Sequence, residues 1–269
     1  MTVEERAADL LRQARSRLLS GDVAAARTLL ERAGEEWLAA GDAAEQARCN
    51  ALAATLARYQ QRSAERADQP APEQRQARLL VAAGRADEAT EVLLRASAAL
   101  AAGGAVAEGA RLLAEGVVLL QATGQGDAAQ RLSAEAEILA AAARNHAVSA
   151  ELALLAAGRA IEERDLEAAV AHAERSRVES LAGRSVGGYT AAVIALAELA
   201  DARGDLKGSY GVLATGWVTT ADLVGADLAR TAFEPLLLAM RRRWGGARFD
   251  AARAAYETER RAILRGEAP

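Results

Sequence analysis

The sequence predicts an all-α fold, a stack of about 12–13 helices that pack as antiparallel pairs. Three observations lead to this prediction. Ala, Leu, Arg and Glu dominate the 269 residues, and all four are good helix formers. Only 3% of the residues are aromatic, which suits thin layers of closely packed helices better than one large core. A turn pattern also returns every forty residues through most of the chain.

Each copy of the turn pattern ends on a small residue that lets two helices approach closely. These small residues are Ala89, Ala129, Ala169 and Ser209, each forty residues after the one before. The glycines of the turns can adopt the left-handed conformation that ends a helix, and Asp or Asn can cap the next helix. Secondary breaks lie between these turns, near Gly103, Asn145, Gly183 and Gly225. Each forty-residue period should therefore hold two helices of about eighteen residues.

The turn Gly21-Asp22, followed by Ala26, Leu30 and Ala33, resembles the signature of tetratricopeptide repeats. The helices are longer than in the common form of that repeat, and the similarity covers residues 1–40 and 72–265. The resemblance implies a right-handed α-solenoid in which the first helix of each pair lines a concave groove. Forty-residue versions occur in bacterial regulatory and sensor domains, including peptide-sensing regulators and the C-terminal arms of large transcriptional activators.

The forty-residue period fails between Ala26 and Ala89, which are sixty-three residues apart. The gap contains Asp68-Gln69-Pro70-Ala71-Pro72, which no helix can pass through intact. We therefore expect an N-terminal helical unit at 1–66, a Pro-containing hinge at 67–72, and a repeat array with an Arg- and aromatic-rich C-terminal cap at 73–269. Residues 62–72 would form either a flexible linker or an extended return along the stack.

The composition argues against several classes of function. A net charge of −4 gives no general attraction to nucleic acid or to an anionic membrane. Cys49 is the only cysteine, and His146 and His172 have no partners at the spacing of a metal site. We expect a protein that is not an enzyme and needs neither cofactor nor metal. The acidic start lacks the apolar core of a signal peptide, which favours a cytoplasmic protein.

The tetratricopeptide resemblance implies which side chains line the groove. The corresponding positions are Arg75, Arg78, Arg111, Glu115, Glu151, Glu162, Glu198 and Asp201. The groove would be basic at its N-terminal end and acidic toward its C-terminal half, with side chains that are solvated until a basic segment of a partner binds. The family's clamp for a terminal carboxylate uses Lys and Asn, and neither occurs at these positions. The alternative is a solvated helix face without a partner.

The C-terminal end has a different character from the rest of the chain. Residues 241–265 contain eight arginines and three acidic residues, and most of the aromatic residues lie in the C-terminal third. Arg and aromatic residues are common at binding hot spots. A second candidate interface therefore consists of Trp217, Arg241, Trp244 and Arg248. The alternative is that the aromatic side chains cap the core of the stack.

Two functional hypotheses follow from this pattern. The first is a protein-interaction scaffold or adaptor that binds a peptide or protein partner in a concave groove. The alternative is a ligand- or peptide-sensing regulatory domain that changes conformation on binding. An open polar groove would favour the scaffold, whereas an apolar pocket closed at the centre of the groove would favour the sensor.

Overall fold

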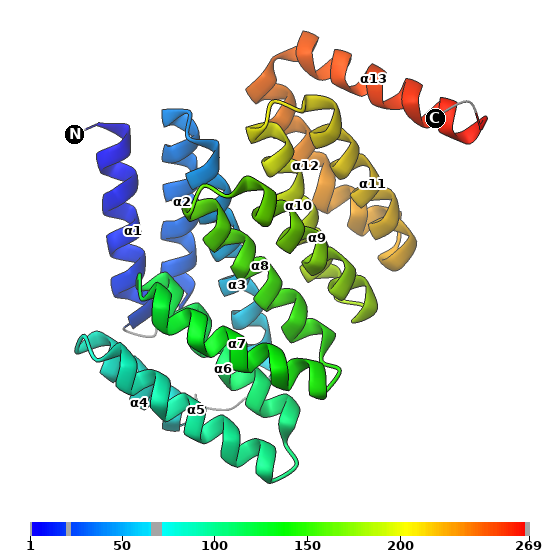
Figure 1. Cartoon of the computed structure of the whole chain (residues 1–269). Helices are drawn as coiled ribbons and strands as arrows, with labels where there is room; N and C mark the ends of the chain where they lie inside the picture. Colours follow the sequence, from blue (N-terminus) through cyan, green and yellow to red (C-terminus); the bar gives the residue numbers. More distant parts are fainter. Residues whose placement is uncertain (1, 20–22, 66–71, 267–269) are drawn as a thin grey trace. The chain divides into compact units, whose positions relative to one another are not determined.

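The computed structural model describes residues 2–19, 23–65 and 72–266, and all the regular structure in these segments is helical (Figure 1). The helices are α1 (Val3–Leu19), α2 (Val23–Ala40), α3 (Ala43–Glu65), α4 (Pro72–Ala82), α5 (Ala86–Ala102), α6 (Val106–Ala122), α7 (Gly126–Ala142), α8 (His146–Glu162), α9 (Leu166–Ala182), α10 (Val186–Ala202), α11 (Leu206–Val224), α12 (Ala226–Trp244) and α13 (Gly246–Leu264). The prediction of an all-α chain is confirmed.

The helices follow a regular register from α5 onward. The starts of successive helices from α5 to α13 are twenty residues apart, so that two helices make one forty-residue period. The small residues that mark this period in the sequence are buried, because Ala89, Ala169 and Ser209 are 0% exposed and Ala129 is 2% exposed. A larger side chain at these positions would push neighbouring helices apart.

The turns show how the register is maintained. Three residues separate one helix from the next throughout α4 to α11, and the middle residue of each turn has a positive φ. Glycine fills four of these positions, whereas Arg144, Arg164 and Arg184 adopt φ values of 50°, 61° and 51°. Side-chain caps follow at Asn145, Asp165 and Asp205, which accept hydrogen bonds from the backbone N–H groups of the next turn.

The turn type changes after α11. Helices α11 and α12 each have nineteen residues, and a single glycine follows each of them. These glycines, Gly225 and Gly245, have φ values of 97° and 80°. The longer helix and the shorter turn compensate each other, so the twenty-residue interval is kept.

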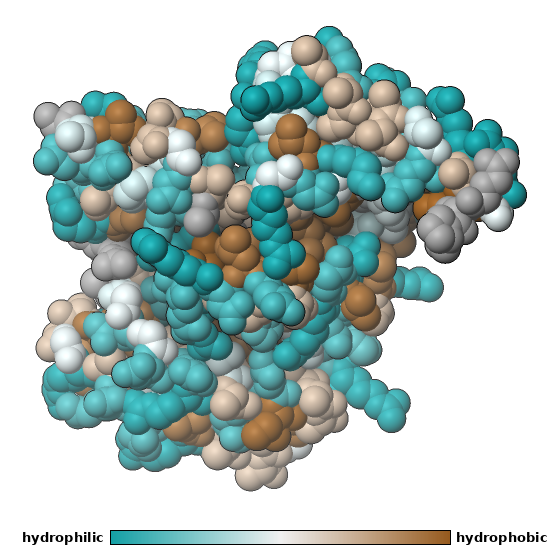
Figure 2. Space-filling model, turned by 45° about the horizontal axis from the view of Figure 1, so that its top comes forward, coloured by the Kyte–Doolittle hydropathy of each residue, from teal (hydrophilic) through white to brown (hydrophobic). Residues whose placement is uncertain are grey.

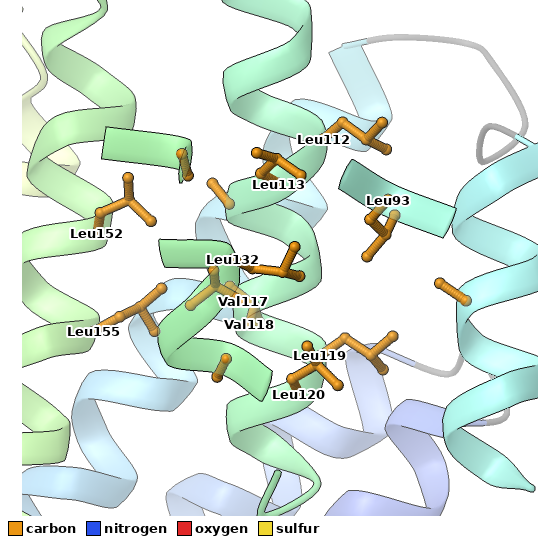
Figure 3. Packing of buried hydrophobic residues seen from close by; sticks show 14 of the residues in the cluster. Leu93, Leu112, Leu113, Val117, Val118, Leu119, Leu120, Leu132, Leu152 and Leu155 are labelled. Atoms are coloured by element: carbon orange, nitrogen blue, oxygen red, sulfur yellow. The ribbon is translucent and has the colours of Figure 1, made fainter. Parts of the chain in front are cut away.

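The chain forms two compact units, which are described separately. Unit 1 comprises Met1–Ser185 and unit 2 comprises Val186–Pro269. In unit 1, Leu113 and Leu120 of α6, Leu132 of α7, and Leu152 and Leu155 of α8 converge in the largest core cluster (Figure 3). The predicted hinge at 67–72 lies almost wholly outside the described residues, and its role as a hinge stays a prediction.

The N-terminal helices of unit 1 do not continue the stack in sequence order. Helix α1 packs against α2, and α2 packs against α3. Helix α3 then packs against α8 and contacts α6, while α1 contacts α4 and α6. Helices α1 and α3 therefore lie against the first helices of the pairs α4–α5, α6–α7 and α8–α9.

The core of unit 2 is built from large side chains. Tyr189 of α10 and Phe233 of α12 are almost completely buried, and Phe249 of α13 packs in the same cluster. Glycines in α11 make room for neighbouring side chains. A Cβ at Gly216 would lie 2.5 Å from Val193, and one at Gly211 would lie 2.8 Å from the ring of Tyr256. Close helix packing therefore explains these glycines.

Candidate functional site

A cleft in unit 1 lies beside the first turn of helix α4. Helices α5 and α6 have seventeen residues each, whereas α4 has eleven and begins at Pro72. The twenty-residue register would place the start of α4 at position 66. In this register, the C-terminal half of α5 and the N-terminal half of α6 extend beyond the start of α4. A cleft of about 430 Å³ lies in this region.

Three helices contribute the walls of this cleft, which we call the α4–α6 cleft. Its lining residues are Glu73 and Gln74 of α4, Ala96, Ala99 and Leu100 of α5, and Glu108, Arg111, Leu112 and Glu115 of α6. The four residues from α6 follow one another at intervals of three, one and three residues. This spacing places them on one face of the helix.

The α4–α6 cleft combines acidic groups with an apolar wall. Its charged residues are three glutamates and one arginine, so the lining carries an excess of negative charge. Glu108 is exposed, whereas Arg111 is half-buried beside it on α6. The apolar wall is formed by small side chains of α5 and by Leu112, which is 6% exposed. Such a lining can bind a cationic group and an adjacent apolar group together.

A small apolar pocket adjoins the α4–α6 cleft. Gln74 and Glu115 line both cavities, and the side-chain amide of Gln74 donates a hydrogen bond to the Glu115 carboxylate. The other lining residues of the pocket are mainly apolar and include Leu56, Leu93 and Leu119. Its volume is about 30 Å³, which is room for about one water molecule.

The structure brings three of the predicted N-terminal groove residues to these cavities. Arg111 and Glu115 line the α4–α6 cleft, and Arg78 lines the small pocket with Glu115. Arg75 is exposed on α4 and lines neither cavity. The remaining cleft residues were not predicted. Their signal in the sequence is Pro72, which lies inside the helix that the twenty-residue register would require.

The two predicted acidic residues of α8 are not free, solvated side chains. Glu151 is only 4% exposed, because α3, α6, α7 and α9 all pack against α8. Glu162 is exposed in part, but its carboxylate lies 2.6 Å from the guanidinium of Arg48 on α3. The expectation that these carboxylates are solvated in the free protein is therefore wrong for Glu151. The carboxylate of Glu162 already forms an ion pair with Arg48.

The remaining predicted acidic residues lie in unit 2. Arg243 lies 2.5 Å from Asp201 and 4.0 Å from Glu198, and the indole N–H of Trp244 donates a 2.9 Å hydrogen bond to Asp201. Burial raises the pKa of Glu198 to about 7, the nearby Arg243 opposes this rise, and the Asp201 carboxylate adds to it. These two carboxylates are therefore next to Arg243 and Trp244 of the same unit, and they are not simply solvated.

The candidate C-terminal interface separates into buried and exposed parts. Trp217 and Trp244 are half-buried and pack against the core of unit 2. Arg241 lies over the ring of Phe249, 5.9 Å from its centroid, and forms an ion pair with Asp250. Arg248 is exposed. Packing in the core accounts for the two tryptophans, in agreement with the capping alternative.

Exposed apolar side chains lie on several helices of both units. Examples are Leu79 of α4, Ile138 of α7, Val178 of α9, Leu228 of α12 and Leu264 of α13. Polar residues cover most of the face that Figure 2 shows, and apolar residues appear between them, several of them together near the middle of the view. Single exposed apolar residues are normal on soluble surfaces and do not mark a site.

Other chemical groups do not form a recognisable centre in the described part of the chain. No group of three or more His, Cys, Asp and Glu residues there could hold a metal ion. Burial raises the pKa of Cys49 to about 12, so this thiol is neutral at ordinary pH and a poor nucleophile. Among the described helices, none is both long and apolar enough to cross a membrane. The sequence matches no family model and no curated protein.

Proposed function

We propose that the chain is a tetratricopeptide-like scaffold that binds a short peptide segment of a partner protein in the α4–α6 cleft. The observation that carries this proposal is the open cleft of about 430 Å³. The twenty-residue helix register and the buried small residues support the comparison with tetratricopeptide repeats.

The lining of the cleft indicates the chemistry of the bound segment. An Arg or Lys side chain would be attracted by Glu73, Glu108 and Glu115, and a neighbouring apolar side chain would cover Leu100 and Leu112. Arg111 could donate hydrogen bonds to a backbone carbonyl or a carboxylate of the same segment, because its guanidinium offers several N–H donors. Exposed ion pairs add little affinity individually, so apolar contact must accompany the charge.

The geometry favours the scaffold over the sensor. A ligand-sensing site would need an enclosed apolar pocket large enough for a small molecule. The apolar pocket beside the cleft holds only about 30 Å³. The larger cavity carries polar residues and belongs to the open cleft. We therefore propose peptide binding as the function and do not assign a small-molecule ligand.

A displayed peptide library tests this proposal with the full chain. Peptides enriched on the wild type should contain an Arg or Lys next to an apolar residue. The variant Ala99→Trp fills the cleft from the exposed side of α5 and should weaken these peptides at least tenfold. Ala98→Trp is the matched control, because Ala98 is also exposed on α5 but does not line the cleft. Equal binding to both variants would refute the assignment of the site.

A further inference from the structure

The small apolar pocket that adjoins the α4–α6 cleft has a closely packed floor. Leu56 of α3 and Leu93 of α5 line it, and each is only 1% exposed. Gly116 of α6 lines it as well, and a Cβ at this glycine would lie 2.5 Å from Cδ1 of Leu93 and 2.9 Å from Cδ1 of Leu132. These two leucines therefore lie directly against the backbone of α6. The pocket is a space beside well-packed side chains, which have little freedom to close it.

The side of the pocket toward solvent is polar. Gln74 and Arg78 of α4 and Glu115 of α6 line the pocket and are half-buried, whereas its apolar lining residues are buried. Gln74 and Glu115 also line the α4–α6 cleft, and their side chains are joined by a hydrogen bond. The same two side chains therefore border both spaces. A mainly apolar interior with a few polar groups is the usual composition of a binding site.

The size of the pocket suits one methyl group. Its volume of about 30 Å³ is room for one group of the size of water, and a methyl group is of similar size. An ordered water molecule needs about two to four polar partners. The buried part of the wall, which includes Ala77, Val118 and Leu119, has only apolar side chains. An apolar group therefore fits the interior of this pocket better than water does.

From these observations we infer that the small apolar pocket is a second subsite of the α4–α6 cleft and that it binds the side chain of an alanine in the peptide. The inference rests on the proposed peptide binding and adds a second specific residue to the bound segment. Gln74 and Glu115 border both spaces, so one peptide reaches both at once. Its Arg or Lys lies near Glu73 and Glu108, and its alanine lies in the pocket.

The test measures binding of three fluorescent synthetic peptides to the full chain by anisotropy. The first is a peptide that the displayed library enriches on the wild type, and the other two carry glycine or valine in place of its alanine. The glycine peptide should bind the wild type about fourfold more weakly, as expected for the loss of one buried methyl group. The valine peptide should bind at least threefold more weakly, because its side chain is too large for the closely packed space.

Two substitutions in the pocket should change these preferences in opposite directions. Ala77→Val adds two methyl groups to the wall and fills the pocket, so the alanine and glycine peptides should bind this variant with affinities within about twofold of each other. Val118→Ala removes two methyl groups from the wall, and the valine peptide supplies two. The Val118→Ala protein should therefore bind the valine peptide at least threefold more tightly than the alanine peptide.

Matched control variants are available on the same two helices. Ala82→Val makes the first change at an exposed position of α4. Val117→Ala makes the second change at a buried position of α6 that lines neither the pocket nor the cleft. Both controls should keep the order of the wild type, with the alanine peptide bound most tightly. The order of the three peptides on the wild type itself needs no variant, so a variant that fails to fold leaves the test decisive.

Two results would overturn this inference and leave peptide binding in the cleft standing. The first is a set of enriched peptides that contain Arg or Lys and lose affinity for Ala99→Trp but show no preference for alanine. The second is a preference for alanine that folded Ala77→Val and Val118→Ala proteins both retain unchanged. A library that yields no enriched peptides, or peptides that bind Ala99→Trp as tightly as the wild type, would overturn the proposed function and this inference with it.

Discussion

The two units share one helix register but fill their cores in different ways. In unit 1, the buried members of the main cluster are all Ala, Val or Leu. In unit 2, Tyr189, Phe233 and Phe249 fill the core, and glycines of α11 make space for neighbouring side chains. The period of the chain is therefore independent of the size of the core residues. Small residues on one helix allow either a close approach of two helix backbones, as in unit 1, or a large side chain on the neighbouring helix, as in unit 2.

This difference predicts opposite sensitivities to mutation. Unit 1 gains its stability from many contacts between small side chains. Enlarging one of these side chains should therefore lower the free energy of unfolding, even where the added group is only apolar. Unit 2 depends on a few large rings, so removing one ring should leave a cavity that the surrounding helices cannot close. Changes of each kind, made with matched controls, can break or sharpen the comparison.

The largest effect should come from Phe233→Ala in unit 2. The ring is fully buried beside Gly216, and its loss should lower the free energy of unfolding by about 3–5 kcal/mol. Leu228→Ala on the same helix is the control, because Leu228 is 62% exposed. Its expected cost is within about 0.5 kcal/mol. Denaturant titrations of both proteins make the measurement, and equal costs would show that the aromatic core is not what holds unit 2 together.

The complementary test adds volume to unit 1. Ala129→Leu and Ala169→Leu should each lower the free energy of unfolding by about 1–3 kcal/mol, because both alanines are buried at helix contacts. Ala171→Leu lies at an exposed position of α9 and should be nearly neutral. If both buried substitutions were as harmless as the control, close backbone packing would not distinguish unit 1 from unit 2.

A pH titration examines the cluster of Glu198, Asp201 and Arg243 in unit 2. The pKa of Glu198 is about 7 in the folded chain and 4.5 as its ordinary value, so the folded state holds the proton more tightly. Stability from this group is fully present below about pH 4.5 and is lost as the pH rises through about 7. Glu198→Gln should therefore stabilise the protein at pH 8 relative to the wild type, by an amount on the order of 1–3 kcal/mol.

The control for this titration is Glu234→Gln, since Glu234 is exposed on α12. It should leave the dependence of the melting temperature on pH between 4.5 and 8 unchanged. A Glu198→Gln protein with the same pH dependence as the wild type would mean that Arg243 keeps Glu198 ionised in spite of its burial.

The smallest effect concerns the turns that distinguish the middle of the chain from its C-terminal end. Arg144 and Arg164 adopt a positive φ, which glycine adopts without strain. Arg164→Gly should raise the free energy of unfolding by about 0.5–1 kcal/mol. Arg95→Gly, in the exposed interior of α5, should lower it by about 1 kcal/mol. A loss of stability in Arg164→Gly would show that the arginine side chain stabilises the turn.

Local rules in the sequence account for most of the fold but for little of the site. The glycine turns and small residues predict the helices and the burial of Ala129 and Ala169, because these depend on neighbours in sequence. The burial of Glu151 could not be predicted, because it results from the packing of α3 on α8, which no local period encodes. The α4–α6 cleft lies between these cases. Counting back from Ala86 places Pro72 inside an expected helix, but the size of the resulting space needs the structure.

Hydrogen exchange of the full chain with an enriched peptide tests the central claim, peptide binding in the α4–α6 cleft, most directly. We expect added protection in residues 96–100 of α5 and 108–115 of α6, with no change in α12 and α13. The Ala99→Trp protein should lose this protection, and the Ala98→Trp protein should keep it. Protection confined to unit 2, or protection in α5 and α6 that survives Ala99→Trp, would contradict peptide binding in the cleft.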